Sequence, residues 1–147
     1  MGLVGFPASV LPILVDTSFL VTIYDKHEPY HRQCMAALTP LRQPLVTCEP
    51  VITETMYHLR RIPGAPEAVL TSIQEGQLEV PFRVADRAAE VLAHYRKYAD
   101  TPCDFADACL IQMANELGTG DILTLDRDFK HYRWRRNRHF NLLIPLD

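Results

Sequence analysis

Short apolar runs alternate with helical patterns along the whole chain. Five runs have the length and aliphatic content of buried strands, and they cover residues 12–16, 44–47, 78–82, 121–125 and, more weakly, 142–145. Strands that alternate with helices are typical of a parallel sheet, because each parallel neighbour needs a crossover connection. The pattern therefore predicts an α/β fold in which helices cover a parallel sheet.

Helical spacing of apolar residues fills most of the intervals between these runs. The predicted helices cover residues 29–38, 48 to about 61, 66–75, 85–98 and 104–117. Gly76 and Gly118 directly follow two of them and can adopt the left-handed conformation that ends a helix. The last helix is apolar on most of its sides, so we expect it to be buried.

Length and composition are those of one globular domain. The chain has 147 residues, of which 48% are hydrophobic and 22% are charged. We predict a single domain over residues 12–147, preceded by a tail or leader over residues 1–11 that lacks the features of a secretory signal. No apolar run approaches the roughly 20 residues of a membrane span. A cytoplasmic protein without membrane contact is expected.

Cysteine spacing and net charge restrict the possible chemistry further. Cys34, Cys48, Cys103 and Cys109 form no Cys-x-x-Cys pair, which predicts reduced thiols rather than structural zinc or disulfides. The net charge of -3 provides no general attraction to polyanions. Any contact with nucleic acid must therefore be local.

Two aspartates follow predicted strands in the same way. Asp16 follows three aliphatic residues, and Asp126 follows the strand that ends at Leu125. Ligands of open α/β sheets bind outside the carboxyl ends of the strands, where the strand order reverses. A turn or a helix cap explains either aspartate alone. The repetition is what favours a functional site.

Two further acids lie on predicted helices. Asp107 falls in the first turn of the apolar helix, three residues after Asp104, so capping explains part of this pattern. Because the helix is apolar nearly all round, its first carboxylates should lie close to the sheet edge, where a cation would stabilise them. Glu54 shares a helix face with Val51 and His58, and a surface ion pair with His58 or Arg61 would also explain it.

Four segments together resemble the motifs of the PIN domain family. They are Val-Asp-Thr-Ser at 15–18, the glutamate at 54, Asp-Phe-Ala-Asp-Ala at 104–108 and Leu-Thr-Leu-Asp-Arg-Asp-Phe at 123–129. The resemblance spans residues 12 to 146 and is closest to single-domain bacterial VapC-type toxins. It implies a PIN-like three-layer α/β/α sandwich with about five parallel strands, and a metal-dependent endoribonuclease that leaves a 5′-phosphate and a 3′-hydroxyl.

The resemblance also implies roles for individual residues. Asp16, Glu54, Asp107 and Asp126 would hold Mg²⁺ or Mn²⁺ and act in catalysis. Asp104 would be an additional catalytic acid, and Thr17, Ser18 and Thr124 would donate supporting hydrogen bonds. The expected partners are an RNA substrate, a second copy in a homodimer, and a cognate antitoxin that covers the acidic site.

Carboxylates suit phosphodiester hydrolysis because divalent cations acidify bound water and neutralise the charge of the departing oxygen. Magnesium takes one or two direct carboxylates and keeps several waters. We therefore expect Asp16 and Asp107 to bind the metal directly, with Asp126 and Glu54 completing the shell or orienting the attacking water. Without metal, crowded carboxylates would repel each other and raise some of their pKa values.

A basic and aromatic run follows Asp126. Its basic residues are Arg127, Lys130, Arg133, Arg135, Arg136 and Arg138, and the rings of Tyr132 and Trp134 stand between them. Such residues suit phosphate contact and base stacking on single-stranded RNA. A solvated hairpin between the last two strands explains the same run. Both interpretations stay open from the sequence.

Other functions fit the sequence less well. A phosphatase of the haloacid dehalogenase type needs a second aspartate two residues after Asp16, where this chain has Ser18. A phospho-accepting receiver domain needs an acidic pair near the start of the chain, which is absent. The stronger alternative is a non-catalytic PIN fold that binds RNA or a protein, with its acids serving only as caps.

Overall fold

The computed structural model describes residues 10–146, so most of the tail predicted over residues 1–11 lies outside the described residues. Five strands form one sheet in the order β3-β2-β1-β4-β7, and every neighbouring pair is parallel. The strands are β1 (Ile13–Val15), β2 (Leu45–Cys48), β3 (Glu79–Phe82), β4 (Asp121–Leu123) and β7 (Asn141–Leu142). The predicted parallel sheet of five strands is confirmed.

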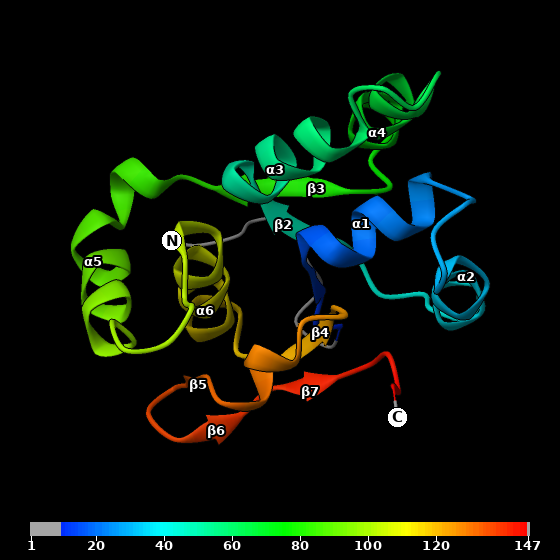
Figure 1. Ribbon diagram of the computed structural model, residues 1–147. Coiled ribbons are helices and arrows are strands. Elements are labelled where there is room, and N and C mark those ends of the chain that lie inside the picture. Colours follow the sequence, from blue (N-terminus) through cyan, green and yellow to red (C-terminus); the bar gives the residue numbers. More distant parts are fainter. Residues whose placement is uncertain (1–9, 147) are drawn as a thin grey trace.

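Helices cover both faces of this sheet. They are α1 (Thr17–Tyr24), α2 (His31–Leu38), α3 (Glu49–Leu59), α4 (Ala65–Gln74), α5 (Ala88–Lys97) and α6 (Phe105–Leu117). Helices α1 to α4 pack against one another, while α5 packs on α6 at the other side of the sheet (Figure 1). The predicted three-layer sandwich is therefore present.

The sheet centre and α6 supply most of the core. Leu14 of β1 lies between Val46 of β2 and Ile122 of β4, and all three side chains are fully buried. Buried residues run along α6 from Ala106 to Ala114, as its apolar sequence predicts. The four cysteines are also buried and none forms a disulfide.

Helix α1 corrects the prediction, which assigned no helix before residue 29. The segment is rich in β-branched residues such as Thr17 and Ile23, which have low intrinsic helix propensity. Burial of Phe19 and Leu20 compensates for this low propensity. The helix begins immediately after β1, with Asp16 as its cap.

Smaller differences concern the ends of elements. Strand β4 ends at Leu123, two residues before the predicted end. The helix expected over 85–98 is divided into a 3-10 turn, η1 (Val84–Asp86), and α5. After β4 come a second 3-10 turn, η2 (Arg127–Lys130), and an antiparallel hairpin formed by β5 (Arg133–Trp134) and β6 (Arg138–His139).

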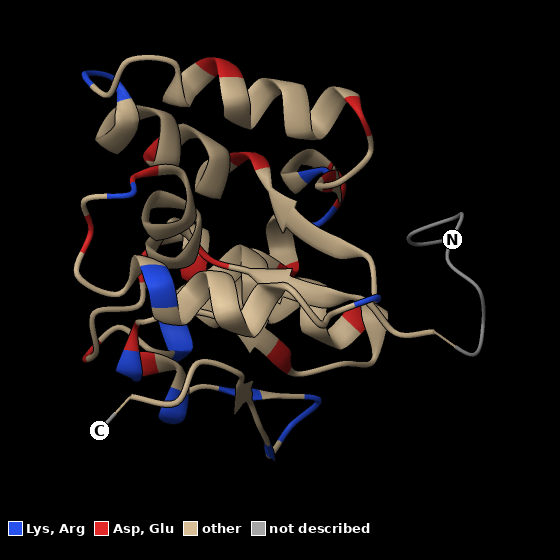
Figure 2. Cartoon of the chain, turned by 90° about the vertical axis from the view of Figure 1, so that its right-hand side faces the viewer, with Lys and Arg blue, Asp and Glu red and all other residues tan. Residues whose placement is uncertain are grey.

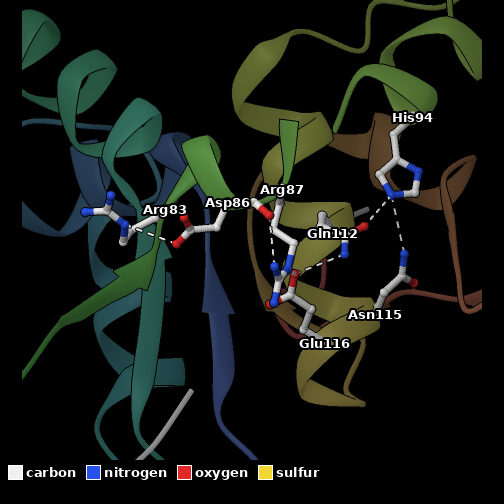
Figure 3. A network of polar contacts seen from close by, with 7 residues as sticks. All are labelled: Arg83, Asp86, Arg87, His94, Gln112, Asn115 and Glu116. Carbon is white, nitrogen blue, oxygen red and sulfur yellow. Dashed lines mark hydrogen bonds and ion pairs between the residues drawn. The ribbon is translucent and has the colours of Figure 1, made fainter. Parts of the chain in front are cut away.

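A polar network joins α5 to α6 (Figure 3). Arg87 Nε donates to Glu116 Oε2 at 2.6 Å, and Gln112 Nε2 donates to the same oxygen at 3.0 Å. His94 Nε2 lies 2.9 Å from Gln112 Oε1 and 3.4 Å from Asn115 Nδ2. These bonds hold α5 against the second half of α6.

Among residues 10–146, no helix combines the length and the apolar character needed to cross a bilayer.

The hairpin packs closely on the loop before β4, and this contact allows a test of the fold. A Cβ on Gly120 would lie 2.1 Å from Trp134 Nε1, far closer than van der Waals contact allows, and the indole ring is buried. We expect Gly120→Ala to lower the free energy of unfolding by about 2 kcal/mol in urea denaturation, because overpacking forces the ring to move. The loss should be smaller in a Trp134→Leu background. Equal losses in both backgrounds would contradict this packing.

Candidate active site

Asp16 is held at the carboxyl end of β1 by two hydrogen bonds. Its Oδ1 accepts from the Thr17 backbone N–H at 2.7 Å, and its Oδ2 accepts from the Thr124 hydroxyl at 2.7 Å. The side chain is buried, with 5% of its surface exposed. The residue is thus a helix cap, as the simpler interpretation expects, and its orientation is also fixed from the neighbouring strand β4.

Hydroxyl groups fix the segment that follows β4. Thr124 Oγ1 accepts from the Asp126 backbone N–H at 2.9 Å, and Ser18 Oγ accepts from the Leu125 backbone N–H at 2.9 Å. The two hydroxyl oxygens lie 3.3 Å apart. Ser18 and Thr124 therefore join the ends of β1 and β4 and bring Asp126 toward Asp16.

Asp107 belongs to a complete capping box at the start of α6. Its backbone N–H donates to Asp104 Oδ1 at 2.9 Å, and its Oδ2 accepts from the Asp104 backbone N–H at 3.3 Å. The same Oδ2 accepts from the Tyr132 hydroxyl at 3.2 Å. The carboxylate is 6% exposed, so this capping residue also faces the buried sheet edge, as expected from the apolar helix.

Three of the predicted acids converge on one point. Asp16, Asp107 and Asp126 each offer a carboxylate oxygen, and these oxygens all lie within 4.8 Å of one another. None of the three forms an ion pair with a basic side chain within residues 10–146. A set of oxygen ligands suits hard cations such as Mg²⁺ or Mn²⁺, and buried carboxylates need such a partner. The donor set therefore fits a divalent cation.

Glu54 and Asp104 lie on the wall of the same cavity, which has a volume of about 480 Å³, but outside the group of three. Glu54 is carried by α3, and its Oε1 accepts from the Thr17 hydroxyl at 2.9 Å. The ion pair considered for Glu54 with His58 is not formed in the described part of the chain. Thr17 therefore orients Glu54 toward the cavity.

Burial and the neighbouring charges raise the pKa values of Asp16, Asp107, Asp126 and Glu54. Burial raises the pKa of Asp16 to about 6, and the charge of Asp126 adds to the rise. Burial, followed by the charge of Asp16, raises the pKa of Asp107 to about 8. Burial also raises the pKa of Asp126 and of Glu54. The predicted repulsion contributes in each case, but loss of hydration is the larger cause.

The two aromatic rings expected to stack on RNA bases are buried instead. Tyr132 has no exposed surface and packs edge-on against Phe129, while Trp134 is 7% exposed and donates its indole N–H to the His139 carbonyl at 3.0 Å. Rings enclosed in this way cannot present a face to a base, which corrects the stacking prediction. Tyr132 instead orients Asp107, a contact that no local pattern predicts because 25 positions separate the two residues.

Blue segments, which mark lysine and arginine positions, lie along the lower part of the chain in Figure 2. Arg135 and Arg136 are exposed in the loop of the hairpin and have positive φ angles of 40° and 74°. The Arg135 backbone N–H donates to Asn115 Oδ1 at 2.6 Å, near the end of α6. Asn115 is eight residues beyond Asp107, or about 12 Å along the helix axis. The hairpin loop is therefore distant from the acids.

Comparison with known proteins agrees with this fold and site. The PIN domain family model matches residues 13–135. The chain is 29% identical to Ribonuclease VapC26 of Mycobacterium tuberculosis over 136 residues, covering 91% of this chain and 93% of that protein. The crystal structure of VapC20 from the same organism, a toxin described as cleaving the sarcin-ricin loop, superimposes with a TM-score of 0.74 at 22% identity and covers 86% of this chain and 98% of that one.

A parallel α/β/α sandwich with acids gathered at the ends of β1 and β4 is the architecture of a PIN-like fold. With a family match over most of its length, the chain belongs to the PIN domain family. The similarity to VapC20 supports the fold itself.

The raised pKa of Asp107 predicts how stability depends on pH in the absence of metal. A carboxyl group whose pKa is raised on folding stabilises the protein while protonated, and this contribution is lost as the pH rises from about 4 to about 8. In EDTA, we expect Asp107→Asn to remove this loss and to be more stable than the wild type at pH 8, by about 3 kcal/mol.

Urea denaturation at pH 5 and pH 8 measures the effect. The exposed Asp100→Asn variant serves as the matched control and should keep the pH dependence of the wild type. An Asp107→Asn protein whose stability falls with pH as steeply as that of the control would contradict the assignment.

Proposed function

We propose that the protein is a metal-dependent endoribonuclease and the toxin of a type II toxin–antitoxin pair. The observation that carries the proposal is the convergence of the Asp16, Asp107 and Asp126 carboxylates within 4.8 Å. Membership of the PIN domain family and similarity to a protein named Ribonuclease VapC26 support the same activity.

Asp16 and Asp107 would hold Mg²⁺ or Mn²⁺ directly, with Asp126 completing the set. A divalent cation bound there would acidify water and neutralise charge on the phosphate and the departing oxygen. Hydrogen bonds from Thr17 N–H, the Thr124 hydroxyl and the Tyr132 hydroxyl keep the ligand carboxylates in place before the substrate arrives. Such preorganisation reduces the rearrangement that the reaction requires.

Glu54 would orient the attacking water. The Thr17 hydroxyl donates to its Oε1, which fixes the carboxylate on the cavity wall. Burial raises the pKa of Glu54, so its carboxylate is a better proton acceptor than an exposed glutamate. Asp104 would act indirectly, because its side chain caps the turn that positions Asp107.

RNA would be held by basic residues after Asp126. Arg127 and Lys130 belong to η2, which begins next to Asp126, and Lys130 is exposed. Arg133, Arg135 and Arg136 would contact phosphates farther along the strand. Trp134 does not belong to this set because its ring is buried.

Two protein partners complete the proposal. A cognate antitoxin would cover the acidic cavity, and a second copy would form a homodimer. Leu92, Tyr95 and Phe105 support the homodimer, because these large apolar side chains are 45%, 51% and 47% exposed and line one shallow surface hollow with Val84 and Ala88. Light scattering in solution tests the homodimer.

Cleavage of total RNA tests the activity. We expect cleavage at defined positions only when Mn²⁺ or Mg²⁺ is present, with end-mapping that gives 5′-phosphate and 3′-hydroxyl ends. Asp16→Asn should lower the rate at least about 100-fold, because it removes a ligand charge. Asp100→Asn, an exposed acid outside the cavity, should cleave like the wild type. Equal cleavage by both variants would rule out the assigned site.

Thermal melting separates this proposal from a non-catalytic PIN fold. A ligand that binds only the folded state raises its melting temperature, so Mn²⁺ should stabilise the wild type and leave Asp16→Asn nearly unchanged. A non-catalytic fold whose acids serve only as caps would show no such difference. The titration is most sensitive near pH 8, where Asp107 is closer to full ionisation.

A further inference from the structure

The cavity that contains the acids extends well beyond them. Its wall continues along α1 to Val21 and Thr22 and then to the loop that carries Glu28, Pro29 and Tyr30. Val21 is five residues after Asp16, which corresponds to about 8 Å along the helix. The cavity therefore has an acidic end and, roughly one nucleotide away, an end lined by apolar and aromatic groups.

Tyr30 is held in position at this second end. It precedes α2 and its carbonyl accepts from the Cys34 N–H at 2.9 Å. The imidazole Nδ1 of the next residue, His31, lies 2.8 Å from the Thr22 carbonyl oxygen. The His31 backbone N–H donates to the Glu28 carbonyl at 3.1 Å. These hydrogen bonds attach the loop of Glu28 to Tyr30 to α1. The backbone that carries the Tyr30 ring is therefore held in place.

The ring itself is available to a ligand. Tyr30 lines the cavity, and 46% of its surface is exposed. The Glu28 carboxylate has no hydrogen bond or ion pair in the described chain. An aromatic face beside a free carboxylate can stack on a planar group and accept its N–H donors.

The charges of the cavity indicate which part of RNA would fit. No lysine or arginine lines it, and His58 is the one histidine among its lining residues, while six of them are acids: Asp16, Glu28, Glu54, Asp104, Asp107 and Asp126. A second phosphate at the Tyr30 end would face these acids with no lysine or arginine to offset their charge. A base is neutral, planar and rich in N–H donors, so it suits this end where a phosphate does not.

Resting on the proposed nuclease function, we propose that the Tyr30 end of the cavity is a base-binding subsite that takes one unpaired nucleobase next to the cleaved phosphate. Tyr30 stacks on the base, Pro29 and Val21 form the apolar wall, and Glu28 accepts from the base edge. A paired base is already stacked and has its edge occupied. The substrate class that follows is RNA with a splayed nucleotide at the cut, in a loop or a single strand.

Steady-state cleavage of a short RNA oligonucleotide that spans a mapped cut tests the subsite. We expect Tyr30→Ala to raise KM about 5- to 150-fold with a small change in kcat, the range of one lost base stack. Tyr30→Phe should restore KM, because the ring performs the stacking. Tyr57→Ala, which removes an exposed tyrosine of α3 outside the cavity, should behave like the wild type.

An abasic nucleotide in the substrate identifies the base. At one position beside the cut, the abasic nucleotide should raise the KM of the wild type to that of Tyr30→Ala. At other positions, the KM of Tyr30→Ala should stay higher than that of the wild type. Equal KM values for Tyr30→Ala and Tyr57→Ala, with active wild type, would overturn the subsite and leave the nuclease proposal intact.

A binding measurement separates the subsite from the catalytic proposal. The fluorescent base 2-aminopurine is placed at the identified position, or at each position of a short single-stranded RNA if no cut is found. Its fluorescence should fall when the RNA binds the Asp107→Asn variant and the base stacks. The loss should disappear when Tyr30→Ala is added. Tyr30-dependent quenching without any wild-type cleavage would refute the nuclease and keep the subsite. Absence of quenching at every position would refute the subsite.

Discussion

The whole site depends on three carboxylates that repel one another, two of them buried and the third, Asp126, partly buried. Asp16 and Asp107 are almost completely enclosed, and their pKa values rise because water is excluded. Each is nevertheless held in one orientation by donors from the backbone or from hydroxyl groups. These donors reduce the cost of burial without neutralising the charge. The three carboxylates therefore lower the stability of the fold locally, and their oxygens form a set of ligands that fits a divalent cation.

The topology explains why these acids meet. Strands β1 and β4 are neighbours in the sheet although more than one hundred residues separate them. After β1 the chain continues into one helical layer, and after β4 it continues on the opposite side of the sheet. A crevice forms where the strand order reverses, and both aspartates lie there. The start of α6 lies at the same edge, so Asp107 enters from a third element. Glu54 extends from α3 to the cavity, where the Thr17 hydroxyl holds its carboxylate.

Sequence reasoning succeeded where a residue's place follows from regular structure. Asp16 and Asp126 end aliphatic strands, and Asp107 begins an apolar helix, so their meeting at one edge was predictable. It failed for α1, where tertiary burial outweighs β-branched propensity, and for Trp134, whose exposure depends on the contact with Gly120. Neither the Tyr132 bond to Asp107 nor the cavity beside Tyr30 has a local pattern, because both arise from segments that are distant in the sequence.

One hydrogen bond connects the basic hairpin to the acids despite their separation. Tyr132 immediately precedes β5, and its hydroxyl holds the Asp107 carboxylate. Tyr98 and Phe129 pack edge-on against the Tyr132 ring, and Phe140 packs edge-on against Phe129. A displacement of the backbone of the arginine loop would therefore move Asp107, one of the three converging carboxylates, so the geometry of the acids depends on a hairpin that lies away from them.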